Sequence, residues 1–275
     1  MKKKITCMAL LITSALYQTT VFSSSTEKEN SLDDRQNIQA QWSTPNSIYI
    51  ALSAGGAFST DASLVVPPVF WDPSPEGYNN NVGDSEVLGA SIGYVLSPLF
   101  RVELGADHRN SFEYNKFLST PTSTTWGPRT RKFHLSNTTV MGSLFINGSG
   151  INRAYQGNGF IIDPFFGAGL GSAFNVLDNM HSTQTIGNRD FSIMSAANTT
   201  RSFAYQFSVG FDVKTSRKLA LGVGYRYLNA GHFSSNNYIV DNPDNISLTS
   251  GVTVPAWTGI LRTNEVYVTL KYAIA

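Results

Sequence analysis

The chain has 275 residues, a formal net charge of +1 and 14% charged residues, with no basic tract after residue 4, so its charge gives no support to a nucleic-acid partner. Its 23 glycines and 12% aromatic residues favour an extended sheet over a helical protein. No apolar run beyond residue 23 is long enough for a membrane-spanning helix.

Residues 1–23 predict a secretory signal peptide. A cluster of lysines ending at Lys4 precedes an apolar run, and small residues such as Ser23 follow it. The single cysteine, Cys7, lies in this segment, so the exported chain is expected to form no disulfide. Residues 24–46 are polar and weakly patterned, which predicts a flexible periplasmic N-terminal arm, and residues 47–275 are long enough for one barrel domain.

Beyond the arm, the chain alternates apolar with small or polar side chains in segments of about ten residues. Successive side chains of a strand point to opposite faces, so this period of two predicts strands whose faces meet different surroundings. In the final segment, Val266, Val268 and Leu270 share one face, and Glu265 and Lys271 share the other. The predicted strands are 47–57, 86–96, 99–109, 137–147, 159–173, 201–212, 219–227 and a final strand after residue 259.

The connections between these strands alternate between long and short. The long connections are 58–85, 110–135, 174–200 and 231–259, and the shorter turns are 97–98, 148–158 and 215–218. Pro164 cannot donate to a strand ladder, so we expect it near a strand start or at a bulge.

An even number of antiparallel strands joined in this way is typical of bacterial outer-membrane barrels. Lipid offers no hydrogen bonds to a sheet edge, so a spanning sheet must close on itself. The sequence therefore predicts an all-β fold, an eight-stranded antiparallel up-and-down transmembrane β-barrel with four long extracellular loops and short periplasmic turns.

Several segments carry a family resemblance. The glycine-striped stretch 164–171, the strand 221–227 and the final strand resemble the eight-stranded bacterial outer-membrane β-barrel proteins related to the transmembrane domain of outer-membrane protein A. The resemblance implies an integral outer-membrane location after export, contact with outer-membrane lipids and lipopolysaccharide, and insertion by the barrel-assembly machinery. That machinery is expected to read a terminal aromatic residue. Here Ile274 stands at the outward position, and Tyr272 lies two residues before it.

The inward-facing charged side chains are expected to form a network that fills the lumen. Buried charges persist only when they are paired, and eight strands leave an interior wide enough only for side chains. The chain directions predict that Asp107, Arg109, Arg226 and Glu265 share the outer half, with Arg101, Glu103 and Lys271 nearer the periplasm and Asp163 and Asp212 lower down. The alternative interpretation is an ion-conducting path or a salt-bridge gate, as in a small porin.

A second alternative is an enzyme that modifies lipid A. Such an enzyme needs a histidine beside a serine and an acid at the outer rim, and His108 with Ser111 and Glu113 is the set best placed for this. The simpler interpretation makes His108 a polar rim residue, and the remaining histidines lack metal-ligand spacing. We therefore predict no enzymatic activity, no catalytic residues, no cofactor and no metal site.

The first long connection carries an unusual apolar cluster, which consists of Val65, Val66, Val69, Phe70, Trp71 and Tyr78. Exposed apolar clusters often mark contact surfaces, so adhesin-like binding to a host or matrix surface ligand is one interpretation. The other is that the segment folds over the barrel mouth or rests on the outer leaflet. Trp126 and Trp257, in the second and fourth connections, are candidates for the same surface. The predicted role is therefore structural and surface-interactive.

Overall fold

A computed structural model describes residues 42, 45–65, 81–118, 126–157, 160–186, 189–215, 218–239 and 253–274. Its strands are β1 (Ile48–Ser59), β2 (Asp84–Val95), β3 (Phe100–Leu118), β4 (Trp126–Asn147), β5 (Tyr155–Gly157), β6 (Phe160–Ile186), β7 (Arg189–Ser195), β8 (Asn198–Lys214), β9 (Leu219–Ser234), β10 (Tyr238–Ile239), β11 (Thr253–Val254) and β12 (Thr258–Ala273). A 3-10 turn, η1 (Gly148–Ile151), follows β4. Within these ranges no helix has the length and apolar character needed to cross a membrane. The predicted signal peptide and almost all of the predicted arm lie outside the described residues.

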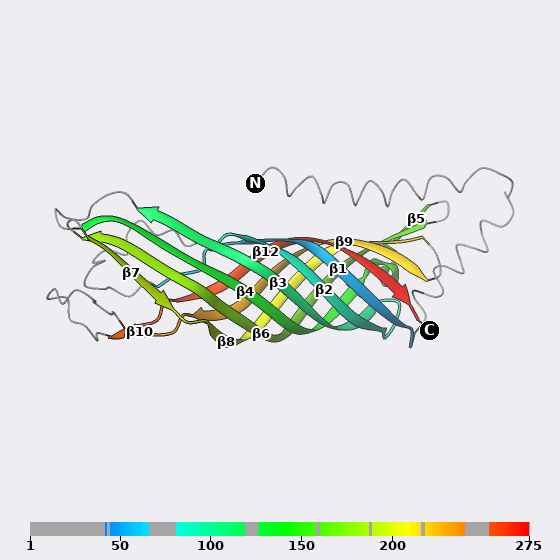
Figure 1. Cartoon of the computed structure of the whole chain (residues 1–275). Coiled ribbons are helices and arrows are strands. Elements are labelled where there is room, and N and C mark those ends of the chain that lie inside the picture. The colour runs from blue at the N-terminus through cyan, green and yellow to red at the C-terminus, as the bar shows by residue number, and fades with distance from the viewer. Residues whose placement is uncertain are drawn as a thin grey trace, which may run out of the picture. The chain divides into compact units, whose positions relative to one another are not determined.

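Eight strands close into one antiparallel ring, in the order β1, β2, β3, β4, β6, β8, β9, β12 (Figure 1). The ring closes where β1 pairs with β12 along its length, from Tyr49 opposite Ala273 to Ser59 opposite Thr263. Consecutive ring strands are neighbours throughout, which confirms the predicted up-and-down barrel. The short strands β5 and β7 pair with β6 outside the ring, and β10 pairs with β11.

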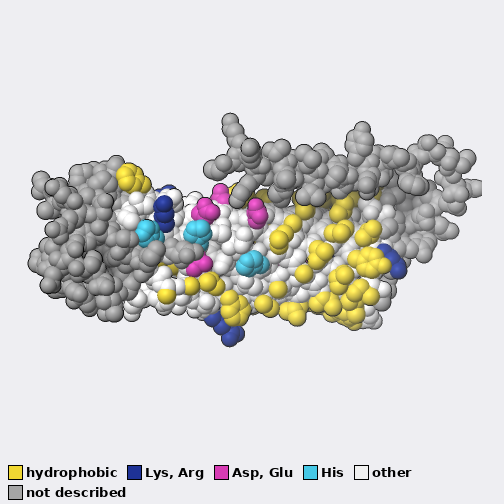
Figure 2. Space-filling view, in the orientation of Figure 1, with side chains coloured by type: hydrophobic (Ala, Val, Ile, Leu, Met, Phe, Trp, Pro, Cys, Tyr) yellow, Lys and Arg dark blue, Asp and Glu magenta, His cyan; other side chains and the backbone are white. Residues whose placement is uncertain are grey.

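Large apolar side chains are exposed on the outward face of every ring strand. Examples are Leu52, Leu88, Leu104, Leu144, Leu170, Phe207, Val223 and Leu270. Figure 2 shows this apolar band over one half of the barrel wall, with acidic and histidine side chains gathered beyond it. An apolar exterior around a polar interior is the arrangement of a wall that faces lipid.

The predicted long connections 110–135 and 174–200 are wrong over most of their length, because strands continue through them. β3 and β4 extend well past the predicted strand ends, and Figure 1 shows them running on at one end of the barrel with β6 and β7. In this extension the polarity of the wall reverses: Lys132 and His134 are exposed, whereas Phe133 and Leu135 are buried. Where the wall is surrounded by water, its apolar side chains face the inside of the barrel and its polar side chains face outward. This is the reverse of the alternation in the lipid-facing half.

The predicted connection 231–259 is also shorter than expected, since β9 runs to Ser234 and β12 begins at Thr258. Gly231 lies in this extension with a φ of +71°, a conformation that side chains rarely adopt. The register between β12 and β9 shifts beside it, between Ile260 and Arg262. A similar irregularity in β3, between Arg109 and Phe112, inserts one extra residue, so that both of these side chains are buried although they are three positions apart.

Pro164 is the fifth residue of β6, near its start as expected. β4 ends at Asn147, opposite Phe165, so Pro164 meets no β4 residue. On its other side it pairs with Phe211 of β8 without a register shift, and no bulge is needed.

Candidate functional site

The lumen contains an upper charge layer, which consists of Asp107, Arg109, Arg226 and Glu265. Glu265 is fully buried and accepts hydrogen bonds from Arg109 Nε at 2.6 Å and Arg226 Nε at 2.7 Å. Arg226 also donates through Nη1 to Asp107 at 2.8 Å. Two guanidinium groups therefore alternate with two carboxylates across β3, β9 and β12, so each buried charge has a partner of opposite sign.

A lower charge layer lies nearer the short-turn end and consists of Arg101, Glu103, Asp212 and Lys271. Asp212 accepts from Arg101 Nη1 at 2.6 Å and from Lys271 Nζ at 2.7 Å. Arg101 Nε lies 3.5 Å from Glu103, whose carboxylate also accepts from the Tyr49 hydroxyl at 2.5 Å. This layer is again balanced in charge.

Aromatic rings and a separate ion pair complete the short-turn end of the lumen. The Arg101 guanidinium lies 4.7 Å from the ring centroid of Phe145 and 5.0 Å from that of Phe165. Below them, Lys214 Nζ donates to Asp163 at 2.6 Å, and Asp163 also accepts from the backbone N–H of Ser149 at 2.7 Å. Of the nine charged side chains predicted to fill the lumen, eight thus lie in two paired layers, with Asp212 at the centre of the lower one, and Asp163 pairs with Lys214 below them.

A cavity of about 60 Å³ lies between the two layers, with Glu103, Asp107 and Arg226 in its wall. Gln206 also lines it and donates to Ser143 at 2.9 Å. Since a water molecule needs about 10–15 Å³ of such space, the cavity has room for a few waters. It is a small polar pocket within the lumen.

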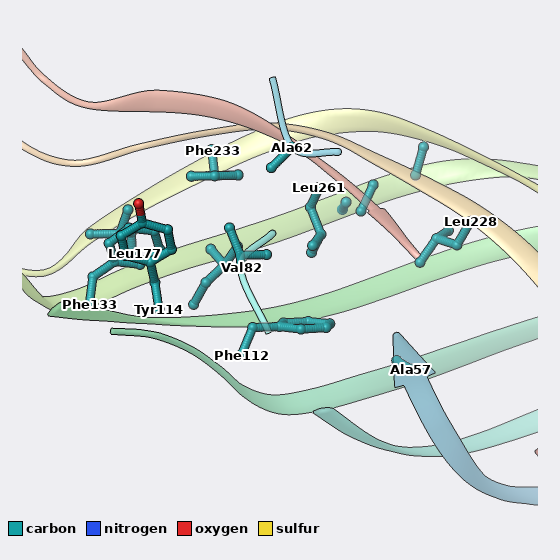
Figure 3. Packing of buried hydrophobic residues seen from close by; sticks show 14 of the residues in the cluster. Ala57, Ala62, Val82, Phe112, Tyr114, Phe133, Leu177, Leu228, Phe233 and Leu261 are labelled. Carbon is teal, nitrogen blue, oxygen red and sulfur yellow. The ribbon is translucent and has the colours of Figure 1, made fainter. Parts of the chain in front are cut away.

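Above the upper layer the lumen is filled by a buried apolar core. The rings of Tyr114 and Phe133 stack at 4.6 Å, and Trp257 meets them edge-on at 6.4 and 6.3 Å. Phe112, Leu177, Leu228, Phe233 and Leu261 belong to the same buried cluster, and Figure 3 shows them, with Tyr114 and Phe133, inside the surrounding strands. Sequence reasoning missed this core because it assigned these segments to loops, although the alternation of Phe133 and Leu135 with polar residues was a usable signal.

The histidine and the serine considered for the enzyme alternative have different neighbours in the structure. His108 is exposed, and its Nδ1 lies 2.9 Å from Thr138 Oγ1. Ser111 Oγ is instead 3.3 Å from Nδ1 of His134. In the ranges covered by the structure, no group of three or more His, Cys, Asp or Glu side chains is placed to hold a metal ion.

Of the apolar cluster in the first connection, only Val65 is described. It is 61% exposed and forms an isolated bridge with Thr258 at the start of β12. Val66, Val69, Phe70, Trp71 and Tyr78 lie outside the described residues. Trp257 belongs to the buried core, so the prediction that it contributes to an exposed contact surface is wrong.

Comparison with known proteins gives one sequence family. The model of the outer membrane protein beta-barrel domain matches residues 36–273, a range that contains every ring strand. No curated protein sequence matches the chain.

Several solved structures are similar at low sequence identity. Neisserial surface protein A is 13% identical, with 81% of this chain and 96% of that chain covered and a TM-score of 0.37. The outer membrane protein OprG from Pseudomonas aeruginosa is 10% identical, with coverages of 84% and 98% and a TM-score of 0.44. Ail, the attachment invasion locus protein of Yersinia pestis, solved with the heparin analogue sucrose octasulfate, is 8% identical, with coverages of 82% and 99% and a TM-score of 0.34.

Proposed function

The chain belongs to the family of outer-membrane β-barrel proteins, and on this basis we propose that it is a structural, surface-interactive barrel with a closed lumen. The proposal places the long connections outside the cell, the short turns in the periplasm, and residues 1–23 as the signal that directs export. Membrane insertion is assigned to the barrel-assembly machinery, with residues 24–46 left as a periplasmic arm.

The main observation behind this proposal is that three successive layers of side chains fill the lumen. The buried apolar core, the upper charge layer and the lower charge layer each contain side chains that are almost completely buried, such as Trp257, Glu265 and Asp212. Between the charge layers there is space for a few waters. This supports a filled barrel over a small porin, because conduction would require all three to open together.

Planar-bilayer recording tests the closed lumen. Purified wild-type protein, folded as judged by heat-modifiable migration, is expected to give no large and stable single-channel steps. A variant in which Phe133, Phe233 and Trp257 are all alanine is expected to remain closed, because both charge layers are left intact. Stable steps from the wild-type protein would instead establish the porin interpretation.

We further propose that the first long connection binds a host or matrix surface. Val65 is the member of the apolar cluster that the structure describes, and its side chain is largely exposed. Bacteria that display a chain without residues 65–78 are expected to lose most binding to host cells or matrix. The matched control removes residues 119–125 from the second connection, and heat-modifiable migration checks both barrels. Unchanged binding after the first deletion would assign the segment to the barrel mouth or the outer leaflet.

We also propose that the barrel has no enzymatic activity. His108 and Ser111, which a lipid A-modifying enzyme would need together, have different hydrogen-bond partners on β4. Because Ser111 lies beside His134 instead, alanine at His108 and alanine at His134 are both expected to leave lipid A acylation unchanged.

A further inference from the structure

The short-turn end of the lumen contains a second group of buried apolar side chains, which includes a residue from outside the barrel strands. Trp42, which precedes β1, is 7% exposed, and Tyr49 on β1 is 2% exposed. The centroids of their rings lie 6.1 Å apart. The other buried members are inward-facing residues near the strand ends: Ala51, Val95, Ile161, Ala220 and Ala273. The indole of Trp42 thus packs in a cluster to which five barrel strands contribute.

Small side chains of the barrel strands leave room for this indole. Three of the buried strand residues in the cluster, on β1, β9 and β12, are alanines. The interior of an eight-stranded barrel is just wide enough for side chains to fill it. Alanines on three strands do not fill that width, so a large ring from outside the strands can occupy the remaining space.

The chain enters β1 through a turn that is tied to the end of β2. Asn46 has a φ of +73°, a left-handed conformation that asparagine adopts more readily than most residues. Its backbone N–H donates to the carbonyl of Val95 at 2.8 Å, and the N–H of Val95 donates to the carbonyl of Ser47 at 2.9 Å. Its side-chain Oδ1 accepts from the Tyr94 hydroxyl at 2.5 Å. Trp42 is therefore tethered four residues from a fixed point of the barrel.

Buried charged groups lie next to the Trp42 cluster. Lys271 Nζ is 5.8 Å from the ring centroid of Tyr49. Ile161 is paired across strands with Lys214, which is bonded to Asp163. Lys271, Lys214 and Asp163 are all at most 4% exposed. Since ion pairs are stronger where water is excluded, a cover at this end of the lumen stabilises the pairs above it.

We propose that the segment before β1 is a plug, in which the Trp42 indole occupies a site at the short-turn end of the lumen and closes that end to water. The site binds an aromatic ring that the chain itself supplies. Because Trp42 belongs to no barrel strand, its side chain can leave the site without the loss of a strand hydrogen bond. The plug rests on the proposed closed lumen and adds a further closure to it, at the end opposite the buried apolar core.

Access of water to the site is measured by the reactivity of a single thiol. Val95→Cys places this thiol in the cluster, in a chain whose one cysteine, Cys7, is replaced with serine. A charged methanethiosulfonate reagent labels a thiol that water can reach. With Trp42 present, labelling in mild detergent is expected to be slow. Trp42→Ala is expected to raise the labelling rate at least about 10-fold, because truncation of a buried tryptophan leaves a cavity.

The matched control is Trp257→Ala, because Trp257 is also buried but lies at the opposite end of the lumen. It is expected to leave the labelling rate unchanged, and heat-modifiable migration establishes that each barrel is folded. Trp42→Phe keeps a smaller ring and is expected to give an intermediate rate, which provides the comparison if the alanine variant does not fold. Equal rates in the Trp42 and Trp257 variants would overturn the plug. Fast labelling with Trp42 present, in a barrel that gives no channel steps, would overturn the plug and leave the closed lumen standing.

Return of the missing ring tests whether the site binds an aromatic group. Added indole is expected to slow labelling of the Val95→Cys thiol in Trp42→Gly, because glycine leaves space for the complete ring. The same addition to the chain with Trp42 present is expected to change nothing, which controls for effects on the reagent or the detergent. Labelling of Trp42→Gly that stays fast in indole would contradict the proposal.

Discussion

Replacement of Glu265 with glutamine is expected to lower the free energy of unfolding by about 3–5 kcal/mol, the usual cost of removing one partner from a buried ion pair. The side chain is fully buried and accepts hydrogen bonds from Arg109, Arg226 and Thr263. Without its charge, both guanidinium groups remain in the lumen with only Asp107 to balance them. Urea unfolding of the reconstituted barrel, followed by tryptophan fluorescence, measures the change.

Two further variants separate the charge effect from a general effect of the substitution. Glu86→Gln removes an exposed carboxylate from β2 and is expected to change the unfolding free energy by less than about 0.5 kcal/mol. The double variant Arg109→Gln and Glu265→Gln leaves Arg226 paired with Asp107, so part of the lost stability should return. If Glu265→Gln were as mild as Glu86→Gln, the upper charge layer would not stabilise the barrel.

The lipid-facing half of the barrel is predictable from sequence because its two faces meet different surroundings. In β4 the outward residues Val140, Leu144 and Ile146 alternate with Ser143 and Phe145, and this period of two is visible without any structure. Ring closure then follows, since lipid leaves a spanning sheet no other way to satisfy its edges. The number and order of the ring strands could therefore be predicted from the chain.

The extension beyond the lipid could not be predicted from the same pattern. β4 keeps one parity throughout, but its outward residues change from Val140 to His134 and Lys132 as the surroundings change from lipid to water. In β3 the bulge after Arg109 also moves the inward positions by one, so that Phe112 falls out of phase with the lower strand. A prediction that assumes a single alternation with a constant phase ends the strand where the surroundings change or a bulge occurs. The residues beyond that position are then predicted to form a loop.

The charged residues of the lumen are also only partly predictable from the sequence. Alternation places Arg109 and Glu265 on the inward faces of their own strands, but their contact joins residues 156 positions apart. That pairing depends on the register of every strand between them and on the closure of β1 against β12. Asp212, which is the shared acceptor of Arg101 and Lys271, is a comparable case. The sequence identifies which face of each strand carries the charges. The register and closure of the ring determine which charges form ion pairs.

Replacement of Trp257 with alanine is expected to lower the free energy of unfolding by about 3–5 kcal/mol, the range for truncating a buried large aromatic side chain. Trp257 is 1% exposed and packs edge-on against Tyr114 and Phe133. Phe117→Ala is the matched control, because Phe117 is 64% exposed on the outward face of β3 and its loss leaves no cavity. Urea unfolding compares the two.

Hydrogen exchange gives a sharper readout of the same variant, because the buried apolar core lies beyond the band that lipid holds in place. Amide protection in Trp257→Ala is expected to fall in β3 beyond the bulge and in the part of β4 that precedes Leu135, because these segments carry Phe112, Tyr114 and Phe133 into the core. Protection around Leu104 and Leu144, within the apolar band, is expected to stay at the wild-type level. A uniform loss of protection along both strands would mean that the barrel unfolds as one cooperative unit. The apolar band and the part of the wall around the buried apolar core would then not be separate units of stability.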